Sequence, residues 1–93
     1  MAKLSSAEIS ERLKAIPDWR LEKDAITRDF SFSDFLAAMK FVNSVAAIAE
    51  RAGHHPDIDI RYSKVKLALA SHDAGGITER DFSLAMEIDG IGS

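Results

Sequence analysis

The spacing of apolar residues changes twice along the chain, and this change restricts the possible folds more than any other feature. Residues 19–32 and 57–70 each contain two short stretches in which apolar and polar residues alternate, as in strands with one buried face. Between them, residues 33–52 repeat apolar side chains every three or four positions, as in an amphipathic helix. Because strands joined by short turns pair antiparallel, the sequence predicts a hairpin on either side of one long helix.

Two shorter helices are predicted near the ends of the chain. Ser5 and Glu8 have the spacing of a capping box, which begins a helix over residues 6–15. Thr78 and Asp81 have the same spacing and begin the last helix. Both ends of the chain are therefore expected to be helical.

These elements occur in the order α-β-β-α-β-β-α, which predicts an α+β fold. We expect a four-stranded antiparallel sheet with three helices packed on one face, because each strand alternates between apolar and polar side chains. At 93 residues the chain has the usual length of one domain, residues 1–93, and no repeat or linker divides it. A domain of this size buries only roughly 60% of the surface that its unfolded chain exposes, so self-association would stabilise it.

The long helix predicted over residues 33–52 carries a wide apolar surface. Two neighbouring stripes form it, and their members are Phe35, Met39, Val42, Ala46 and Ala49 in one and Phe41, Val45, Ile48 and Ala52 in the other. This surface exceeds what one sheet needs, so we predict that one flank contacts another subunit in a homodimer or homotetramer. The alternative is a helix buried within the core of its own chain, and the sequence does not decide between the two.

Composition excludes several classes of function. The chain has no cysteine, which rules out disulfides, thiolate metal ligands and cysteine nucleophiles, and we expect a cytoplasmic protein. A net charge of -3, with acidic and basic residues interspersed, lacks the basic stripe that direct nucleic-acid binding needs. Nowhere do about eighteen apolar residues run together, so we expect no membrane-spanning segment and no membrane partner.

Two of the three histidines lie at the end of the long predicted helix. Glu50 precedes His54 by four positions, so the two side chains share a face if the helix continues that far, and the carboxylate could then orient the imidazole. His55 would point elsewhere, because adjacent helical residues diverge by about 100°. Pro56 fixes the direction in which the chain leaves.

The third histidine follows the last predicted strand. Continuing the strand's alternation places His72 on the face of Lys66, Ala68 and Ala70, opposite the apolar face. Imidazoles with an ordinary pKa of about 6.5 can donate or accept protons near neutral pH. Three of them suit an elimination in which one group is protonated and another loses a proton.

Each of these residues also has a purely structural interpretation. His54 and His55 would interact favourably with the dipole and last carbonyls of a helix. Asp81 is explained by its cap position, and Glu50 by solvation on a helix surface. A site formed by the three histidines could bind a metal, but neighbouring histidines rarely aim at one ion, so we expect no metal.

The spacing of these residues resembles that of the pterin-4a-carbinolamine dehydratase family. The shared pattern is an acidic residue, a His-His-Pro turn, an aromatic residue, a histidine after a strand and an aspartate that begins the last helix. Its members here are Glu50, His54, His55, Pro56, Tyr62, His72 and Asp81. The resemblance implies a hydro-lyase that dehydrates 4a-hydroxytetrahydropterin to quinonoid dihydropterin, the recycling step after aromatic amino acid hydroxylation. It also implies that neither a metal nor an organic cofactor takes part.

The resemblance further implies roles for individual residues. His54 and His72 would transfer the two protons, one to the departing 4a-hydroxyl and one from N5, and which does which stays open. His55 completes the expected catalytic set and, with Pro56, shapes the pterin pocket. The residues expected to bind the substrate are Glu50, Pro56, Ser71, Asp73 and Asp81.

A second function from a different class is a binding module. Some relatives that this chain resembles act as dimerisation cofactors of a transcription regulator through the long helix. The apolar surface over residues 33–52 is compatible with that role and equally with self-association.

Overall fold

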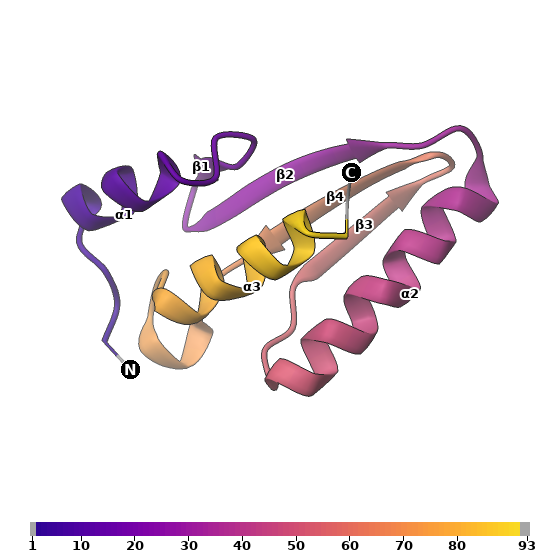
Figure 1. The fold of residues 1–93 in the computed structure, drawn as a ribbon. Coiled ribbons are helices and arrows are strands. Elements are labelled where there is room, and N and C mark those ends of the chain that lie inside the picture. The colour runs from indigo at the N-terminus through magenta and orange to yellow at the C-terminus, as the bar shows by residue number, and fades with distance from the viewer. Residues whose placement is uncertain (1, 92–93) are drawn as a thin grey trace.

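The computed structural model describes residues 2–91, which form one antiparallel sheet with helices on one side of it. The elements are α1 (Ser6–Leu13), β1 (Arg20–Glu22), β2 (Ala25–Ser31), α2 (Phe35–Ala52), β3 (Asp57–Arg61), β4 (Lys64–Leu69), a short 3-10 helix η1 (His72–Ala74) and α3 (Glu79–Asp89). Figure 1 shows this order along the chain. The predicted order of helices and strands is confirmed, and η1 is an addition that the periodicity did not indicate.

The strands are arranged in the order β1-β2-β4-β3, and all neighbours are antiparallel. Each hairpin pairs within itself, and β2 also pairs with β4, so the two hairpins join through their second strands. In this register Ile26 lies opposite Leu69 and Phe30 opposite Val65. The apolar side chains of both central strands therefore share one face of the sheet.

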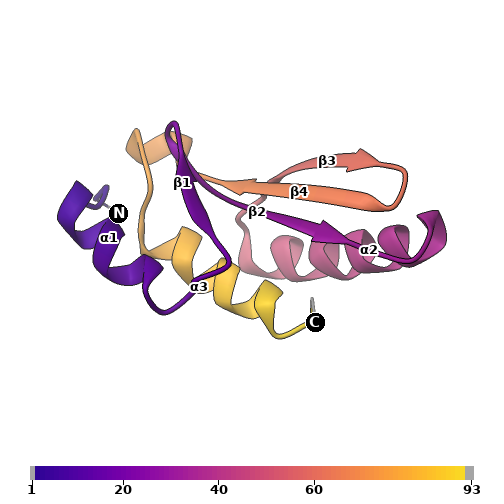
Figure 2. The same ribbon diagram turned by 90° about the horizontal axis from the view of Figure 1, so that it is seen from above.

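All three helices cover that apolar face, as Figure 2 shows from above. The core lies between the sheet and the helices α2 and α3. Its most deeply buried large side chains are Ile26, Leu67, Leu69, Val65, Val45, Leu84 and Ile88. Burying a side chain of this size stabilises the fold by about 1.5–3 kcal/mol, so this layer accounts for the one-sided arrangement.

Helix caps determine where α1, α2 and α3 begin. Both predicted capping boxes are present, with Ser5 and Glu8 at α1 and Thr78 and Asp81 at α3. At α2 the side chain of Asp34 accepts a hydrogen bond from the backbone of residue 37 at 2.8 Å, so this helix begins two residues later than expected.

The end of α1 also differs from the prediction, which extended it to residue 15. The helix ends at Leu13, and the following turns bury Ile16 and Trp19 against the core. Pro17 disfavours helical geometry at Ile16. The backbone N–H groups of residues 14 to 16 donate to carbonyls three positions earlier, so the chain leaves the α-helix in a tighter turn.

Arg28 interrupts the apolar side of β2 without leaving its charge unpaired. Its guanidinium donates to Asp89 Oδ1 at 2.6 Å and lies 4.3 Å from the centre of the Phe30 ring. Trp19 Nε1 donates to the same Asp89 oxygen at 2.8 Å. The end of α3 is thereby tied to the sheet and to the chain before β1.

The long helix α2 is buried along only part of its circumference. Phe41, Val45 and Ile48 pack in the core, whereas Phe35 and Leu36 are 51% and 64% exposed. Val42 and Ala49 are buried as well, so the apolar flank that one chain leaves uncovered is at the start of α2. Among residues 2–91, no helix is both long enough and apolar enough to cross a membrane.

Candidate active site

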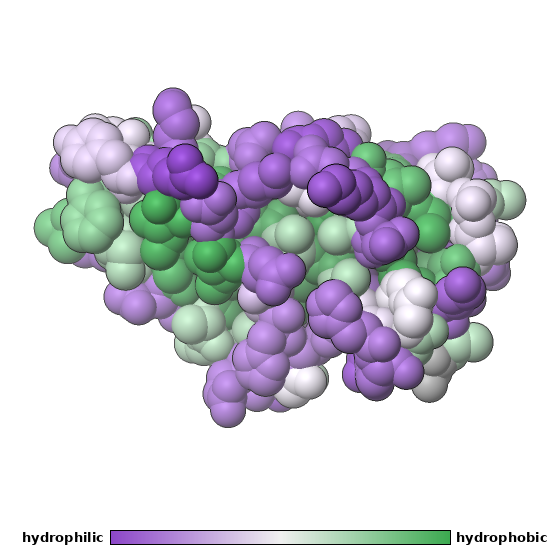
Figure 3. Space-filling model, turned by 180° about the vertical axis from the view of Figure 1, so that it is seen from behind, coloured by the Kyte–Doolittle hydropathy of each residue, from purple (hydrophilic) through white to green (hydrophobic). Residues whose placement is uncertain are grey.

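The face of the sheet that carries no helix contains a cavity of about 440 Å³. Its floor includes Thr27 of β2 and Ala68 of β4, and Lys66, Asp57 and His72 also line it. Figure 3 shows this side of the molecule, where green and pale-green residues lie between bands of hydrophilic residues. The cavity thus combines a flat floor of small residues with polar groups at its margin.

His72 reaches this cavity from the end of β4. It is exposed and shares the cavity with Lys66, Ala68 and Ala70, which confirms the face predicted for it from the alternation of the strand. A tight turn holds it there: Ser71 and Gly76 exchange two backbone hydrogen bonds, at 2.9 and 3.2 Å. The fixed strand end therefore presents an imidazole at the cavity margin.

His54 occupies a different environment, because α2 ends at Ala52. Gly53 has a φ of 66°, the left-handed conformation that glycine adopts easily, and His54 N donates to Ala49 O at 3.1 Å. This turn directs the imidazole inward, where it is only 9% exposed. The expectation that Glu50 and His54 share a helix face is wrong, since the helix does not continue through His54.

The partner of His54 is the carboxylate of Asp81. His54 Nε2 lies 2.5 Å from Asp81 Oδ1, and the other carboxylate oxygen accepts hydrogen bonds from Ser71 Oγ at 3.0 Å and Thr78 N at 2.9 Å. Ser71 Oγ also lies 2.9 Å from Thr78 Oγ1. Because Asp81 is 0% exposed and Ser71 is 1% exposed, this cluster joins three segments of chain below the surface.

Glu50 instead contacts His55. His55 Nε2 lies 2.9 Å from Glu50 Oε1, and both side chains are exposed. Pro56 follows, half-buried, and leads into β3, whose first residue Asp57 lines the 440 Å³ cavity. The carboxylate that was expected to orient His54 therefore orients the next histidine along the chain.

Asp73 lies in η1, on the outside of the loop that follows His72. Arg80 donates to its Oδ1 at 2.7 Å, and this hydrogen bond holds the pKa of the Asp73 carboxyl below its usual value. The pair connects η1 to the first turn of α3. It thereby restrains the loop that carries His72.

The eight predicted site residues gather around the junction of α2, η1 and α3, but they do not share one cavity. Of the eight, only His72 lines the 440 Å³ cavity. His54 lines a smaller cavity of about 200 Å³, together with Ala52 of α2 and Arg80 of α3. Among residues 2–91, no group of three or more histidine, aspartate or glutamate side chains is placed to hold a metal ion.

Several cavity residues come from the first hairpin, which sequence reasoning did not connect with the site. Thr27, Ala25 and Asp24 line the cavity because β2 lies beside β4. Alternation with the buried Ile26 gives the face of Ala25 and Thr27, but periodicity within a strand does not say which strand is its neighbour. The missing information was the strand order.

Comparison with known proteins gives one consistent family. A family model described as "Pterin 4 alpha carbinolamine dehydratase" matches residues 2–91. Two relatives that carry the name "Putative pterin-4-alpha-carbinolamine dehydratase", from Acidobacterium capsulatum and Chloroflexus aurantiacus, are each 59% identical over 91 residues. Each alignment covers 98% of this chain, with 99% and 98% of the relative.

Solved structures are similar over most of the chain as well. A crystal structure from Brucella melitensis, described as a transcriptional coactivator/pterin dehydratase, has a TM-score of 0.93 at 35% identity and covers 98% of this chain and 99% of its own. A pterin dehydratase-like protein described as a RuBisCO assembly factor has a TM-score of 0.69 at 24% identity, covering 82% of this chain and 90% of its own. The second likeness extends to the fold alone.

Proposed function

The chain belongs to the pterin 4 alpha carbinolamine dehydratase family, and on that premise we propose that it dehydrates 4a-hydroxytetrahydropterin to quinonoid dihydropterin and water. In this reaction the bond between C4a and the hydroxyl oxygen breaks, and the oxygen leaves with an added proton as water. N5 loses its proton as the double bond between C4a and N5 forms. The reaction changes no oxidation state, so a general acid and a general base are sufficient for it.

The observation that carries the proposal is the exposed imidazole of His72 at the margin of the 440 Å³ cavity. The small side chains of Thr27, Ala68 and Ala70 leave room for a planar ring against the sheet. Asp57 and Lys66 supply an acceptor and a donor at the margin for the polar edge of such a ring. His72 then transfers one of the two protons.

The difference in burial between His54 and His55 favours His55 as the second proton-transfer group. The resemblance gave this role to His54, but that imidazole is buried and bound to Asp81, whereas His55 is exposed and bound to Glu50. A carboxylate on one ring nitrogen orients the imidazole and fixes its tautomer. In this proposal His54 and Asp81 position the chain that carries His55.

The remaining predicted residues support these groups rather than contact the pterin ring. Asp81 and Ser71 are buried and bind each other, so they fix the segments that carry His54 and His72. Pro56 sets the path from His55 into β3, and Asp73 restrains η1. We place the reaction in the recycling of the pterin cofactor of aromatic amino acid hydroxylases.

The test is the rate of 4a-hydroxytetrahydropterin breakdown, followed by ultraviolet absorbance. General acid–base catalysis contributes about 10²–10⁴-fold, so His72→Ala and His55→Ala are each expected to lose roughly that factor in kcat. Ser10→Ala, an exposed change on α1, serves as the control and leaves kcat unchanged.

Two outcomes would contradict the proposal. One is a well-folded wild-type protein that does not accelerate the breakdown. The other is a double variant of His55 and His72 that keeps near-normal turnover. Circular dichroism of each variant separates loss of chemistry from loss of fold.

The uncovered flank of α2 supports two further proposals about partners. Phe35 and Leu36 are exposed at its start, and we infer that two or four copies of this chain pack through this flank. A second candidate function uses the same surface: the Brucella melitensis structure is described as a transcriptional coactivator as well as a pterin dehydratase. A role as dimerisation cofactor predicts that a regulator co-purifies with the chain and displaces the homo-oligomer without changing turnover.

A further inference from the structure

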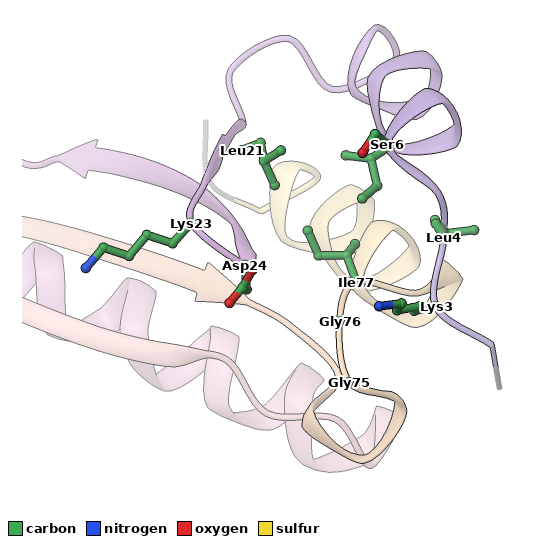
Figure 4. Close-up of a pocket in the computed structure, with 10 residues that line it drawn as sticks. Lys3, Leu4, Ser6, Leu21, Lys23, Asp24, Gly75, Gly76 and Ile77 are labelled. Atoms are coloured by element: carbon green, nitrogen blue, oxygen red, sulfur yellow. The ribbon is translucent and has the colours of Figure 1, made fainter.

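A second cavity, of about 220 Å³, adjoins the one that contains His72. It lies between the N-terminal segment, the turn from β1 to β2 and the loop before α3, as Figure 4 shows. The two cavities share Lys23, Asp24, Gly75 and Gly76. A molecule that occupies the larger cavity near Gly75 can therefore extend into the smaller one.

The N-terminal segment forms a fixed wall of this second cavity. Leu4 N donates to Ile77 O at 2.7 Å, which attaches the segment to the loop that follows η1. The Lys3 side chain runs beside Gly76, where a β-carbon would stand 3.2 Å from Lys3 Cδ (Figure 4). The absence of a side chain at Gly76 thus leaves space for Lys3 to reach the cavity.

The charged residues of this lining are Lys3, Lys23 and Asp24. The Lys23 side chain extends away from Lys3 and Ile77, so Lys3 supplies the ammonium group beside the apolar wall (Figure 4). Among residues 2–91 neither lysine forms an ion pair. The rest of the wall is largely apolar, with Leu4, Leu21, Ile9 and Ile77. An ammonium group beside an apolar wall suits the end of a substituent that carries negative charge.

We propose that the 220 Å³ cavity binds the ring substituent of the pterin and favours a substituent with an anionic group, such as a phosphate monoester. The proposal rests on the proposed function, because it places the ring in the 440 Å³ cavity beside His72. Lys3 lines only the smaller cavity, so it contacts the substituent and not the ring. Lys23 and Asp24 line both cavities, so they lie beside the point at which the ring joins its substituent.

The experiment compares two non-reacting 7,8-dihydropterins that share a hydroxyalkyl substituent, one free and one as its phosphate monoester. Binding to the full chain is measured by titration calorimetry at low salt. Partly exposed ion pairs contribute modestly, so wild type is expected to bind the phosphate ester about two- to five-fold more tightly through Lys3. Salt at about 0.5 M should reduce this preference, because it screens exposed charges.

The matched variants are Lys3→Gln and Lys40→Gln. Each removes one positive charge, but Lys40 is exposed on α2 and lines neither cavity. In the Lys3 variant the affinity for the phosphate ester is expected to fall by about two- to five-fold, while the affinity for the free alcohol stays the same. The Lys40 variant keeps the wild-type ratio.

The outcomes separate this proposal from the proposed function. If wild type dehydrates a 6-methyl carbinolamine and binds both dihydropterins equally, the anionic subsite is overturned and the dehydratase proposal stands. An equal loss of preference in the Lys3 and Lys40 variants would also overturn the subsite, because it would reflect net charge alone. If neither dihydropterin binds and no carbinolamine is dehydrated, both proposals fall together.

Discussion

At the scale of the residue, Asp81 is a carboxylate with no exposed surface, and its surroundings explain how the fold accommodates it. Its two oxygens receive three hydrogen bonds, from His54, Ser71 and the backbone of Thr78. Transfer of a charge out of water is unfavourable unless such partners replace the lost hydration. It also lies in the first turn of α3, where the helix dipole favours negative charge.

Replacing Asp81 by alanine is expected to destabilise the protein strongly. The change leaves the His54 imidazole, the Ser71 hydroxyl and the Thr78 amide buried without their partner. Breaking a buried pair typically costs about 3–5 kcal/mol in the free energy of unfolding. Urea unfolding measures this loss, and Asp73→Ala, which removes an exposed carboxylate bound to Arg80, is the control with little expected change. A loss below about 1 kcal/mol for Asp81→Ala would contradict the network.

The sequence predicted some of this cluster and missed its central contact. The capping box that places Asp81 was visible as a spacing of three from Thr78. The contact with His54 depends on the left-handed turn at Gly53, which no periodicity indicates. A helix that continued past residue 53 would have given the predicted pairing of Glu50 with His54 instead.

At the scale of the element, α1 is joined to α3 by one ion pair in addition to its apolar contacts. Arg12 Nε and one terminal nitrogen donate to the two oxygens of Glu79 at 2.5 and 2.9 Å. The hydrogen bond from Arg12 holds the pKa of Glu79 below its ordinary value of 4.5. A carboxyl whose pKa is lower in the folded chain stabilises the fold above its unfolded pKa, and this contribution is lost as the pH falls through the folded pKa.

The stability difference between wild type and Arg12→Gln is therefore expected to depend on pH. At pH 7 the variant should unfold at a lower urea concentration, because the ionised Glu79 has lost its partner. At an acidic pH below the folded pKa of Glu79 the difference should become small, since Glu79 is then protonated in both states.

Lys14→Gln is the control for this experiment. It breaks a pair with Glu11 within α1, at 3.1 Å, so it should change little at either pH. A difference between wild type and Arg12→Gln that is the same at both pH values would show that the charge of Glu79 is not its cause.

The elements themselves followed from short-range patterns, as did the starts of α1 and α3 at their capping boxes, but the end of α1 and the start of α2 did not. Alternation over residues 19–32 and 57–70 was sufficient for both hairpins, and the helical period gave α2. The ends depend on single contacts, such as the cap of Asp34 that starts α2. The 3-10 turn at η1 is too short to produce a period, although it holds His72 in place.

At the scale of the whole molecule, the cavity depends on the order of the strands rather than on any one strand. Pairing of β2 with β4 brings the first hairpin beside His72 and creates both cavities. The same arrangement places all three helices on one face and leaves the other face open to a ligand. Strand order is a long-range property, and the alternation of a single sequence does not specify it.

Because a flank of α2 is uncovered in one chain, the oligomeric state of the protein is the next property to test. Leu36 is 64% exposed in one chain, and a second copy packed against α2 would bury it. Leu36→Glu places a charge at that contact, where desolvation costs several kcal/mol, so the assembly should dissociate at micromolar concentration. The fold of the single chain should be unaffected, because glutamate in the first turn of a helix interacts favourably with its dipole.

Light scattering during size-exclusion chromatography gives the mass of each species directly. Ser10→Glu adds the same charge to the exposed side of α1 and should keep the wild-type mass. A monomeric wild type would contradict self-association altogether. An oligomer whose mass is unchanged by Leu36→Glu would place the subunit contact on a surface other than the start of α2, and the exposed Phe35 and Leu36 would then be free to bind a different protein.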